Sequence, residues 1–175
     1  MYGITQIKQL LEADGYLNIP EAKISSYLYD SRRLRGAEQT LFVAISGVRH
    51  NGHDYIRELY KKGIRNFLVE EIPENLKDKA NFLKVENTLN AFQKLAQLTR
   101  EKSPAKVIAV TGSNGKTIVK EWLYQLLKAD FRLIKNPKSY NSQLGVPLSV
   151  LQLKGEEELA VFEAGISLPG EMERL

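Results

Sequence analysis

The sequence predicts an α/β protein in two parts, each built around a short parallel sheet. Short apolar runs that suit buried strands alternate with segments whose apolar residues recur at helical spacing. One run, residues 107–110, leads through a glycine-rich turn at residues 112–117 into an amphipathic helix. Another run, residues 159–162, ends at the acidic residue Glu163. Strands that alternate with helices in this way are typical of α/β folds with a binding site at one edge of the sheet.

The first part of the chain contains two expected helices and three expected strands. Apolar residues at helical spacing predict helices over residues 4–12 and 55–60, and Gly63 suits the end of the second helix. The expected strands are residues 41–45, 66–69 and 82–85. Because a helix separates the first two strands, they should form a parallel pair joined by a right-handed crossover.

The second part continues the alternation. A helix is expected after Asn87, a favourable N-cap, and it should end near Arg100. The helix after the glycine-rich turn carries three adjacent apolar pairs, which predicts a buried face that includes Trp122. These pairs are Ile118/Val119, Trp122/Leu123 and Leu126/Leu127. The expected strands are residues 107–110, 131–134 and 159–162.

We place the domain boundary after residue 85, which gives domains at residues 1–85 and 86–175. A nucleotide-binding α/β sheet normally has more strands than residues 105–175 supply. We therefore expect the second domain to be truncated and the sequence to be a fragment.

The composition excludes several classes of protein. The absence of Cys excludes disulfide frameworks, thiolate metal sites and cysteine nucleophiles. No apolar run approaches the roughly 18 residues of a membrane span, and the N-terminus lacks a signal peptide, so we expect a cytoplasmic protein with no membrane partner. The 25 basic and 21 acidic residues alternate in sign, which favours a solvated surface over nucleic-acid binding. The net charge of +4 also suits an anionic small molecule such as a nucleotide.

The turn between residues 110 and 117 has the setting of a phosphate-binding loop, with a strand before it and a helix after it. Its glycines let backbone N–H groups turn inward, and the helix N-terminus adds the positive end of its dipole. Lys116 is placed to reach the β- and γ-phosphates, and the Thr117 hydroxyl is placed to bind Mg²⁺. The match to GxxxxGK[ST] is partial, because Val110 occupies the position of the first glycine. The residues expected to bind the nucleotide are Thr111, Gly112, Ser113, Asn114, Gly115, Lys116 and Thr117.

Glu163 supports this interpretation. In a doubly wound sheet, a carboxylate at the end of a strand lies on the same edge as the phosphate loop, where it can complete a magnesium site. The alternative is an acidic residue that faces solvent. The two histidines, His50 and His53, have no third ligand nearby, which favours helix capping or a substrate hydrogen bond over metal binding. Arg32, Arg33, Arg35 and Arg49 bracket a strand and suit either a diphosphate or a solvated surface.

The loop TGSNGKT, the segment NPKSYNSQLGVPLSVL at residues 136–151 and the segment FEAGISLPGEM at residues 162–172 resemble the Mur ligases. These are ATP-dependent amide ligases that build the peptide of the bacterial cell wall. The loop is similar to that family's own variant of the phosphate loop, which accounts for the missing glycine at position 110. The resemblance implies ATP and Mg²⁺ as cofactors, Lys116 and Asn141 as catalytic residues, and Thr117 and Glu163 as metal ligands.

Residues 29–69 resemble the UDP-sugar-binding domain of the family members that join D-alanyl-D-alanine to UDP-N-acetylmuramoyl-tripeptide. The resemblance implies a UDP-sugar-binding domain at residues 1–85 and the first part of the central ATP-binding domain at residues 86–175. The residues it implies for substrate binding are Asp30, Ser31, Arg32, Gly47, Arg49 and His53. The whole sequence looks closest to a subgroup fused to a C-terminal alanine racemase. The remaining ligase domains would then belong to the full-length chain, so we expect this fragment to be inactive alone.

Three alternative functions remain open on the sequence. Another Mur-type or folylpolyglutamate-type ligase would share the phosphate loop. The folate type lacks the UDP-sugar-binding unit that residues 30–32 (DSR), 42–44 (FVA) and 52–54 (GHD) resemble. A nucleotide-sugar-binding module without catalysis would bind its ligand through the first part, while the loop bound no ATP. A simple P-loop phosphotransferase would leave residues 1–85 without a role.

Overall fold

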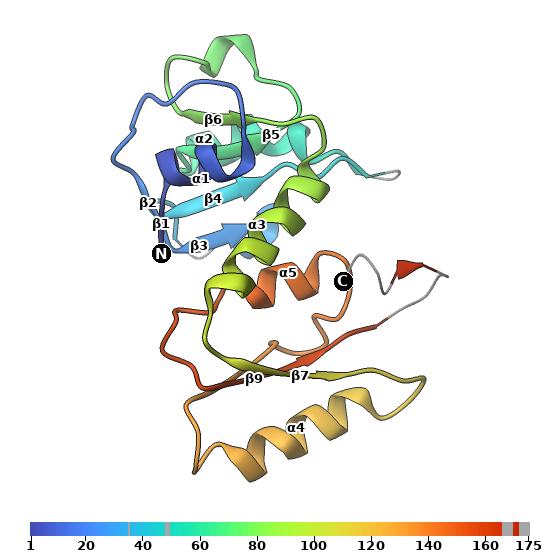
Figure 1. Cartoon of the computed structure of the whole chain (residues 1–175). Coiled ribbons are helices and arrows are strands. Elements are labelled where there is room, and N and C mark those ends of the chain that lie inside the picture. Colours follow the sequence, from blue (N-terminus) through green and yellow to red (C-terminus); the bar gives the residue numbers. More distant parts are fainter. Residues whose placement is uncertain (35, 48–49, 166–169, 172–175) are drawn as a thin grey trace. The chain divides into compact units, whose positions relative to one another are not determined.

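The computed structural model describes residues 1–34, 36–47, 50–165 and 170–171 (Figure 1). The chain divides into two compact units, Met1–Phe92 and Gln93–Leu175, and each is described here by itself. The mixture of helices and parallel sheets confirms the predicted α/β class.

The first unit is built on a four-stranded parallel sheet with the strand order β3-β4-β5-β6. A short antiparallel pair is formed by β1, which precedes the first helix in the chain, and β2, which follows it. The strands are β1 (Tyr2–Gly3), β2 (Lys23–Ile24), β3 (Ser26–Leu28), β4 (Thr40–Val43), β5 (Asn66–Val69) and β6 (Asn81–Lys84). The parallel pairing of β4 with β5 across an intervening helix confirms the predicted parallel pair, and the right-handed crossover stays a prediction.

Three phenylalanines form the centre of the first unit's core. Phe42, Phe67 and Phe82 occupy matching positions on three adjacent strands, and all three are fully buried. The ring centroids of Phe42 and Phe67 lie 6.3 Å apart, and those of Phe67 and Phe82 lie 5.2 Å apart. Aromatic pairs at these separations stabilise a sheet beyond the area they bury.

The first unit contains the two helices expected from their apolar spacing, together with three short 3-10 helices. They are α1 (Ile4–Leu11), η1 (Ser31–Arg33), η2 (Gly52–Tyr55), α2 (Ile56–Lys61) and η3 (Glu74–Leu76). Ile56 and Leu59 bury the inner face of α2, and Gly63 follows the helix with a positive φ of 99°, a conformation that favours glycine. The boundary between the two units falls within α3 (Thr88–Lys102), and Asn87 caps this helix by accepting a 2.9 Å hydrogen bond from the Asn90 N–H.

The second unit contains a three-stranded parallel sheet with the order β7-β9-β8. Figure 1 shows α4 and α5 on opposite sides of β7 and β9. The elements of this unit are β7 (Lys106–Val110), α4 (Lys116–Leu127), β8 (Leu133–Lys135), α5 (Gly145–Val150) and β9 (Leu159–Glu163). Because the sheet is parallel, the carboxyl ends of β7 and β9 lie at one edge, and the phosphate loop follows β7 there.

One expectation for the second unit was wrong, and one expected strand starts two residues late. Trp122 lies on the exposed side of α4 with 67% of its surface accessible, because the helix turns Lys120 and not its apolar pairs toward the interior. Ile118, Val119 and Leu126 of those pairs are exposed as well. The strand expected at residues 131–134 is β8, which begins only at Leu133. The N–H of Phe131 still donates to the carbonyl of Leu127, so the chain is finishing its helix there. None of the helices in the described part of the chain is both long and apolar enough to span a membrane.

Candidate functional site

The phosphate loop lies between the end of β7 and the start of α4. Gly112 and Gly115 have φ values of 138° and 77°, which L-amino acids with side chains rarely adopt. Thr111, Ser113 and Asn114 are exposed. The sequence therefore places glycine at the two positions where this turn requires it, and the N-terminus of a twelve-residue helix follows directly.

Lys116 curls back over this loop. Its Nζ donates hydrogen bonds to the carbonyl oxygens of Gly112, at 2.7 Å, and Ser113, at 3.3 Å. These two bonds hold the ammonium group directly above the turn, where phosphate oxygens would be attracted both to it and to the helix N-terminus.

Thr117 and Glu163 are in direct contact next to the loop. The hydroxyl of Thr117, in the first turn of α4, donates a 2.8 Å hydrogen bond to Oε2 of Glu163 at the end of β9. Glu163 is 2% exposed, so its carboxylate depends on protein partners in place of water. The structure thus brings together the two residues expected to bind the metal.

Asn141 completes the surroundings of this carboxylate. Its Nδ2 donates a 2.7 Å hydrogen bond to Oε1 of Glu163, and its backbone carbonyl accepts one from the N–H of Gly165. A Cβ added at Gly165 would lie 2.9 Å from Cγ of Asn141, so a side chain at this position would displace the Asn141 amide. Each carboxylate oxygen of Glu163 therefore has its own side-chain donor.

The donor set suits Mg²⁺, which prefers oxygen ligands and is usually held by one or two carboxylates together with phosphates and water. Thr117 supplies a hydroxyl and Glu163 supplies a carboxylate. Among the residues that the structure describes, no group of three or more His, Asp or Glu side chains could hold a metal by itself. The phosphates of a nucleotide would have to complete such a site.

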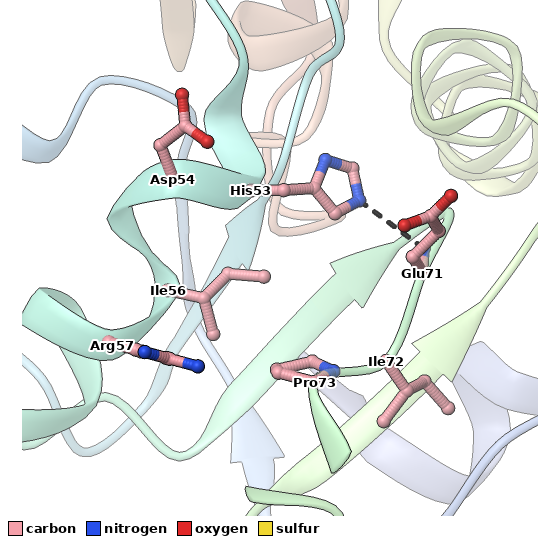
Figure 2. Close-up of a pocket in the computed structure, with 7 residues that line it drawn as sticks. All are labelled: His53, Asp54, Ile56, Arg57, Glu71, Ile72 and Pro73. Atoms are coloured by element: carbon pink, nitrogen blue, oxygen red, sulfur yellow. Dashed lines mark hydrogen bonds between the residues drawn. The ribbon is translucent and has the colours of Figure 1, made fainter. Parts of the chain in front are cut away.

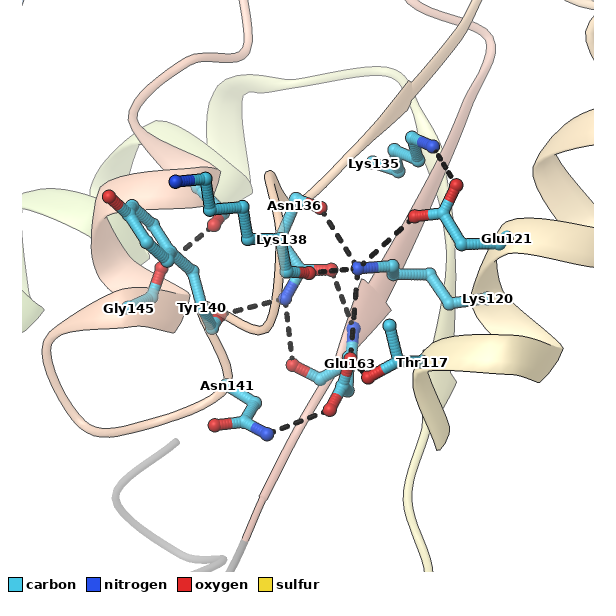
Figure 3. A network of polar contacts seen from close by, with 11 residues as sticks. Thr117, Lys120, Glu121, Lys135, Asn136, Lys138, Tyr140, Asn141, Gly145 and Glu163 are labelled. Carbon is cyan, nitrogen blue, oxygen red and sulfur yellow. Dashed lines mark hydrogen bonds and ion pairs between the residues drawn. The ribbon is translucent and has the colours of Figure 1, made fainter. Parts of the chain in front are cut away.

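A fully buried lysine, Lys120, extends this cluster in a way that the motifs did not predict (Figure 3). Its Nζ lies 3.7 Å from Oε2 of Glu163 and 3.6 Å from Oε1 of Glu121. Glu121 is also paired with Lys135, and the hydrogen bond from Lys135 is the main cause that lowers the pKa of Glu121. The one feature of the sequence that could have indicated this burial is the position of Lys120 between two apolar pairs of an amphipathic helix.

The first unit holds the second set of candidate residues. Asp30 caps η1 by accepting the Arg32 N–H at 3.1 Å, and its two oxygens accept from the Arg32 guanidinium at 2.8 and 2.9 Å. The side-chain hydrogen bond from Arg32 is the main cause that lowers the pKa of Asp30. Ser31 is half-buried, whereas the Arg32 side chain is 87% exposed. Asp30 thus orients an exposed guanidinium that can bind an anion.

His53 is held by the protein through both ring nitrogens. Nε2 accepts a 2.9 Å hydrogen bond from the Glu70 N–H and a longer one, 3.4 Å, from the Glu71 N–H. Nδ1 lies 2.9 Å from Oδ1 of Asn51, so Nδ1 carries the proton and the ring is neutral. Burial is the main cause that lowers the pKa of His53, and it outweighs the nearby carboxylates of Glu70, Glu71 and Asp54.

His53 also borders a pocket of about 390 Å³ in the first unit (Figure 2). The residues that line it are His53, Asp54, Ile56, Arg57, Glu71, Ile72 and Pro73. Gly47 is exposed and donates its N–H to the carbonyl of His50 at 3.0 Å. Arg49, the remaining candidate for substrate binding, lies outside the described residues.

Comparison with known families decides the classification. Residues 23–100 match the family described as "Mur ligase family, catalytic domain", and residues 110–175 match the "Mur ligase middle domain". The chain belongs to the Mur ligase family. The match to the middle domain begins at Val110, where the phosphate loop leaves β7.

Similar Mur ligases have been described in several bacteria. The UDP-N-acetylmuramoyl-tripeptide–D-alanyl-D-alanine ligase of Borreliella burgdorferi is 37% identical over 89% of this chain and 35% of its own length. The ligase of the same name in Escherichia coli strain K12 is 31% identical over 97% of this chain and 36% of its own length. The chain therefore spans about 35% of the length of the curated relatives that it matches.

Solved structures of Mur ligases support the same assignment. MurF from Acinetobacter baumannii superposes on 99% of this chain with a TM-score of 0.87 and 30% identity, over 38% of its own length. MurF ligase from Thermotoga maritima, solved in complex with ADP, superposes on 85% of this chain with a TM-score of 0.72 and 34% identity, over 34% of its length. These likenesses confirm the fold of this chain as that of a Mur ligase.

Proposed function

We propose that this chain is the N-terminal part of a cytoplasmic, ATP-dependent ligase that joins D-alanyl-D-alanine to UDP-N-acetylmuramoyl-tripeptide. The observation that carries the proposal is the contact of Thr117 with Glu163 beneath the loop that bears Lys116. A phosphate loop, a hydroxyl and a buried carboxylate at one sheet edge suit the binding of a magnesium nucleotide. The names of the similar ligases supply the proposed substrates.

In the proposed reaction, a carboxylate oxygen of the tripeptide attacks the γ-phosphorus of ATP, and ADP leaves. The amine of D-alanyl-D-alanine then attacks the acyl phosphate; an amide bond forms, the amine loses a proton and inorganic phosphate leaves. Lys116 and the amides of the loop would neutralise charge on the γ-phosphoryl group as it is transferred. Mg²⁺, held by Thr117 and Glu163, would supply further charge neutralisation at the phosphates. Asn141 would hold Glu163 in place for this role.

The first domain, residues 1–85, would bind the UDP-sugar, and residues 86–175 would form the first part of the ATP-binding domain. The exposed Arg32 guanidinium, oriented by Asp30, suits a diphosphate. Ser31, Gly47, Arg49 and His53 are the further candidates for this substrate. In this proposal His53 acts by holding the backbone at Glu70 and Glu71, because both of its nitrogens are already engaged.

The groups that grip the adenine and the dipeptide would belong to the part of the relatives that this chain does not span. The chain alone should therefore bind its ligands without turnover. An alanine racemase fused in the full-length protein, implied by the sequence resemblance, stays a prediction.

Thermal-shift titrations test the proposal. A ligand that binds only the native state at about a hundred times its Kd stabilises it by about 2.7 kcal/mol, which gives a measurable shift. We expect a shift with UDP-N-acetylmuramoyl-tripeptide that Arg32→Ala abolishes. We also expect a shift with Mg²⁺ and a non-hydrolysable ATP analogue that Lys116→Ala abolishes. Each variant serves as the control for the other ligand, because the two substitutions lie in different units.

Two results would contradict the proposal. A shift with the UDP-sugar but none with the ATP analogue would favour a nucleotide-sugar-binding module without catalysis. A shift with the ATP analogue alone would favour another ATP-dependent enzyme. A separate assay tests the expected inactivity: phosphate release from ATP in the presence of both substrates, above the level of a Lys116→Ala control, would show that the chain turns over by itself.

A further inference from the structure

Lys120 carries a charge into the interior of the second unit. It lies one helical turn after Lys116 on α4, and its side chain is 0% exposed. Lysine is almost never fully buried unless it is paired, because removal of an ammonium group from water is costly. The phosphate-loop motif gives this residue no role, so its burial needs a separate explanation.

The ammonium group is surrounded by oxygen atoms from three elements (Figure 3). Its Nζ donates to the backbone carbonyl of Asn136 at 3.2 Å and also to that of Lys138. It forms ion pairs with Glu163, 3.7 Å from Oε2, and with Glu121, 3.6 Å from Oε1. Lys120 therefore joins helix α4, the end of β9 and the segment that follows β8.

That segment, residues 136–141, contains a constrained backbone position. Lys138 has a φ of 51°, a left-handed conformation that a residue with a side chain adopts only when its surroundings enforce it. Its carbonyl is one of the two that Lys120 binds. Lys120 thus binds the segment at the residue that has the left-handed conformation.

The same segment reaches Glu163 through two asparagines. Asn136 is fully buried; its Oδ1 accepts the Glu163 N–H at 3.0 Å and its Nδ2 donates to the Glu163 carbonyl at 3.0 Å. Nδ2 of Asn136 also donates to the carbonyl of Tyr140, next to Asn141. Asn141 then donates to Oε1 of Glu163. Lys120 and Asn141 therefore hold opposite oxygens of one carboxylate and are connected through one segment.

We infer that Lys120 is a positioning residue for the proposed metal site: it fixes the 136–141 segment and Oε2 of Glu163 so that the carboxylate is presented together with Thr117. This inference rests on the proposed function. The competing role is a simple counter-charge for Glu163. The two roles predict opposite changes in Mg²⁺ affinity when Lys120 is replaced. A counter-charge repels a metal ion, so its removal should tighten Mg²⁺ binding, whereas removal of a positioning residue should weaken it.

The test measures binding of a non-hydrolysable ATP analogue to this chain by calorimetry, in EDTA and over a series of Mg²⁺ concentrations. We expect Lys120→Met to weaken the apparent Mg²⁺ affinity by about 10–100-fold, the usual loss when a group that orients a metal ligand is removed. Affinity in EDTA should be unchanged, because the Lys120 ammonium binds Asn136, Lys138, Glu121 and Glu163, which lie outside the phosphate loop. Lys120→Arg, which keeps the charge and its donors, should recover part of the loss. Lys128→Met, at the exposed end of the same helix, is the matched control.

A double-mutant cycle with Asn141→Ala tests the connection through the segment. If Lys120 and Asn141 act through the same carboxylate, the double variant should bind Mg²⁺ no more weakly than Lys120→Met alone. Effects that multiply would overturn the inference. If Lys120→Met fails to fold, the same cycle is run with Lys120→Arg.

The outcomes separate this inference from the proposed function. If the unaltered chain shows no Mg²⁺-dependent nucleotide binding, the proposed nucleotide site is wrong and the inference falls with it. If the unaltered chain binds and Lys120→Met binds Mg²⁺ equally well or more tightly, only the inference is overturned. Equal losses with Mg²⁺ and in EDTA would also overturn it, because they would indicate general damage to the loop.

Discussion

The hydroxyl of Thr117 lies 2.8 Å from Oε2 of Glu163, although 46 positions separate the two residues in the sequence. This contact joins the first turn of α4 to the carboxyl end of β9, which pairs in parallel with the strand that leads into the phosphate loop. The other oxygen of Glu163 is held by Asn141. A buried carboxylate with fixed partners on both oxygens is pre-organised for a metal ion.

Removal of the Thr117 hydroxyl should weaken Mg²⁺ binding and leave metal-free nucleotide binding unchanged. Thr117→Val keeps the shape of the side chain, and we expect it to weaken Mg²⁺ at least about tenfold, since a bond to a charged group is worth roughly 1.5–3 kcal/mol. Affinity for the ATP analogue in EDTA should be retained. Calorimetry with and without Mg²⁺ measures both, and Thr117→Ser is the control that keeps the hydroxyl. An unchanged Mg²⁺ titration for Thr117→Val would remove Thr117 from the site.

Replacement of Lys116 should weaken nucleotide binding whether or not Mg²⁺ is present. Lys116→Met removes the cation above the loop, so we expect the ATP analogue to bind at least about tenfold more weakly both with Mg²⁺ and in EDTA. The thermal stability of the unbound chain should hardly change, because the Lys116 ammonium donates to carbonyls of the loop itself, those of Gly112 and Ser113. A variant that lost stability but kept its affinity would contradict the phosphate role.

The phosphate loop and its acidic partner were predictable because both follow from rules of parallel sheets. The turn after β7 and the end of β9 meet at one edge whenever the two strands run in the same direction. The sequence therefore sufficed to place Thr117 near Glu163. It also sufficed for β5, whose observed bounds, Asn66–Val69, equal the expected ones.

Other parts of the site depend on tertiary packing that no local pattern records. A lysine in an amphipathic helix is ordinarily a surface residue. Only the fold shows that Lys120 points inward. Helix α5 escaped prediction because it is six residues long and contains Gly145 and Pro147. His53 was expected to contact substrate or cap a helix, whereas both of its ring nitrogens are engaged within the protein.

Replacement of Gly145 by alanine should destabilise the chain. A Cβ at this position would lie 2.6 Å from the carbonyl carbon of Tyr140 and 2.8 Å from its Cα, and backbone atoms cannot rotate aside as the end of a side chain can. We expect Gly145→Ala to lower the free energy of unfolding by about 1–3 kcal/mol, as overpacking does, and to weaken Mg²⁺ binding by displacing Asn141. Urea denaturation provides the measurement. Gly3→Ala, which meets no atom within 4 Å, is the control, and equal stability of both variants would contradict the prediction.

Trp122 should contribute little to the stability of this chain, contrary to its apolar spacing. Because 67% of its surface is exposed, we expect Trp122→Gln to change the free energy of unfolding by no more than about 0.5 kcal/mol. Phe162→Ala, at a buried position of β9 in the same unit, should cost about 3–5 kcal/mol. Circular dichroism follows both transitions, since the first variant lacks the only tryptophan. A loss for Trp122→Gln as large as that for Phe162→Ala would show that the indole is buried.

His53 should make the first unit sensitive to mild acid. Burial holds its pKa below the ordinary value of 6.5, so the folded chain binds the proton less readily than the unfolded chain. The stabilisation from neutral His53 is therefore complete above pH 6.5 and is lost as the pH falls through the depressed pKa. Protonation removes the acceptor of the Glu70 N–H, so protection of that amide from hydrogen exchange should fall over the same range. His53→Gln, which retains an acceptor but does not titrate, should abolish the change. A His53 pKa at or above 6.5, measured by NMR, would contradict this account.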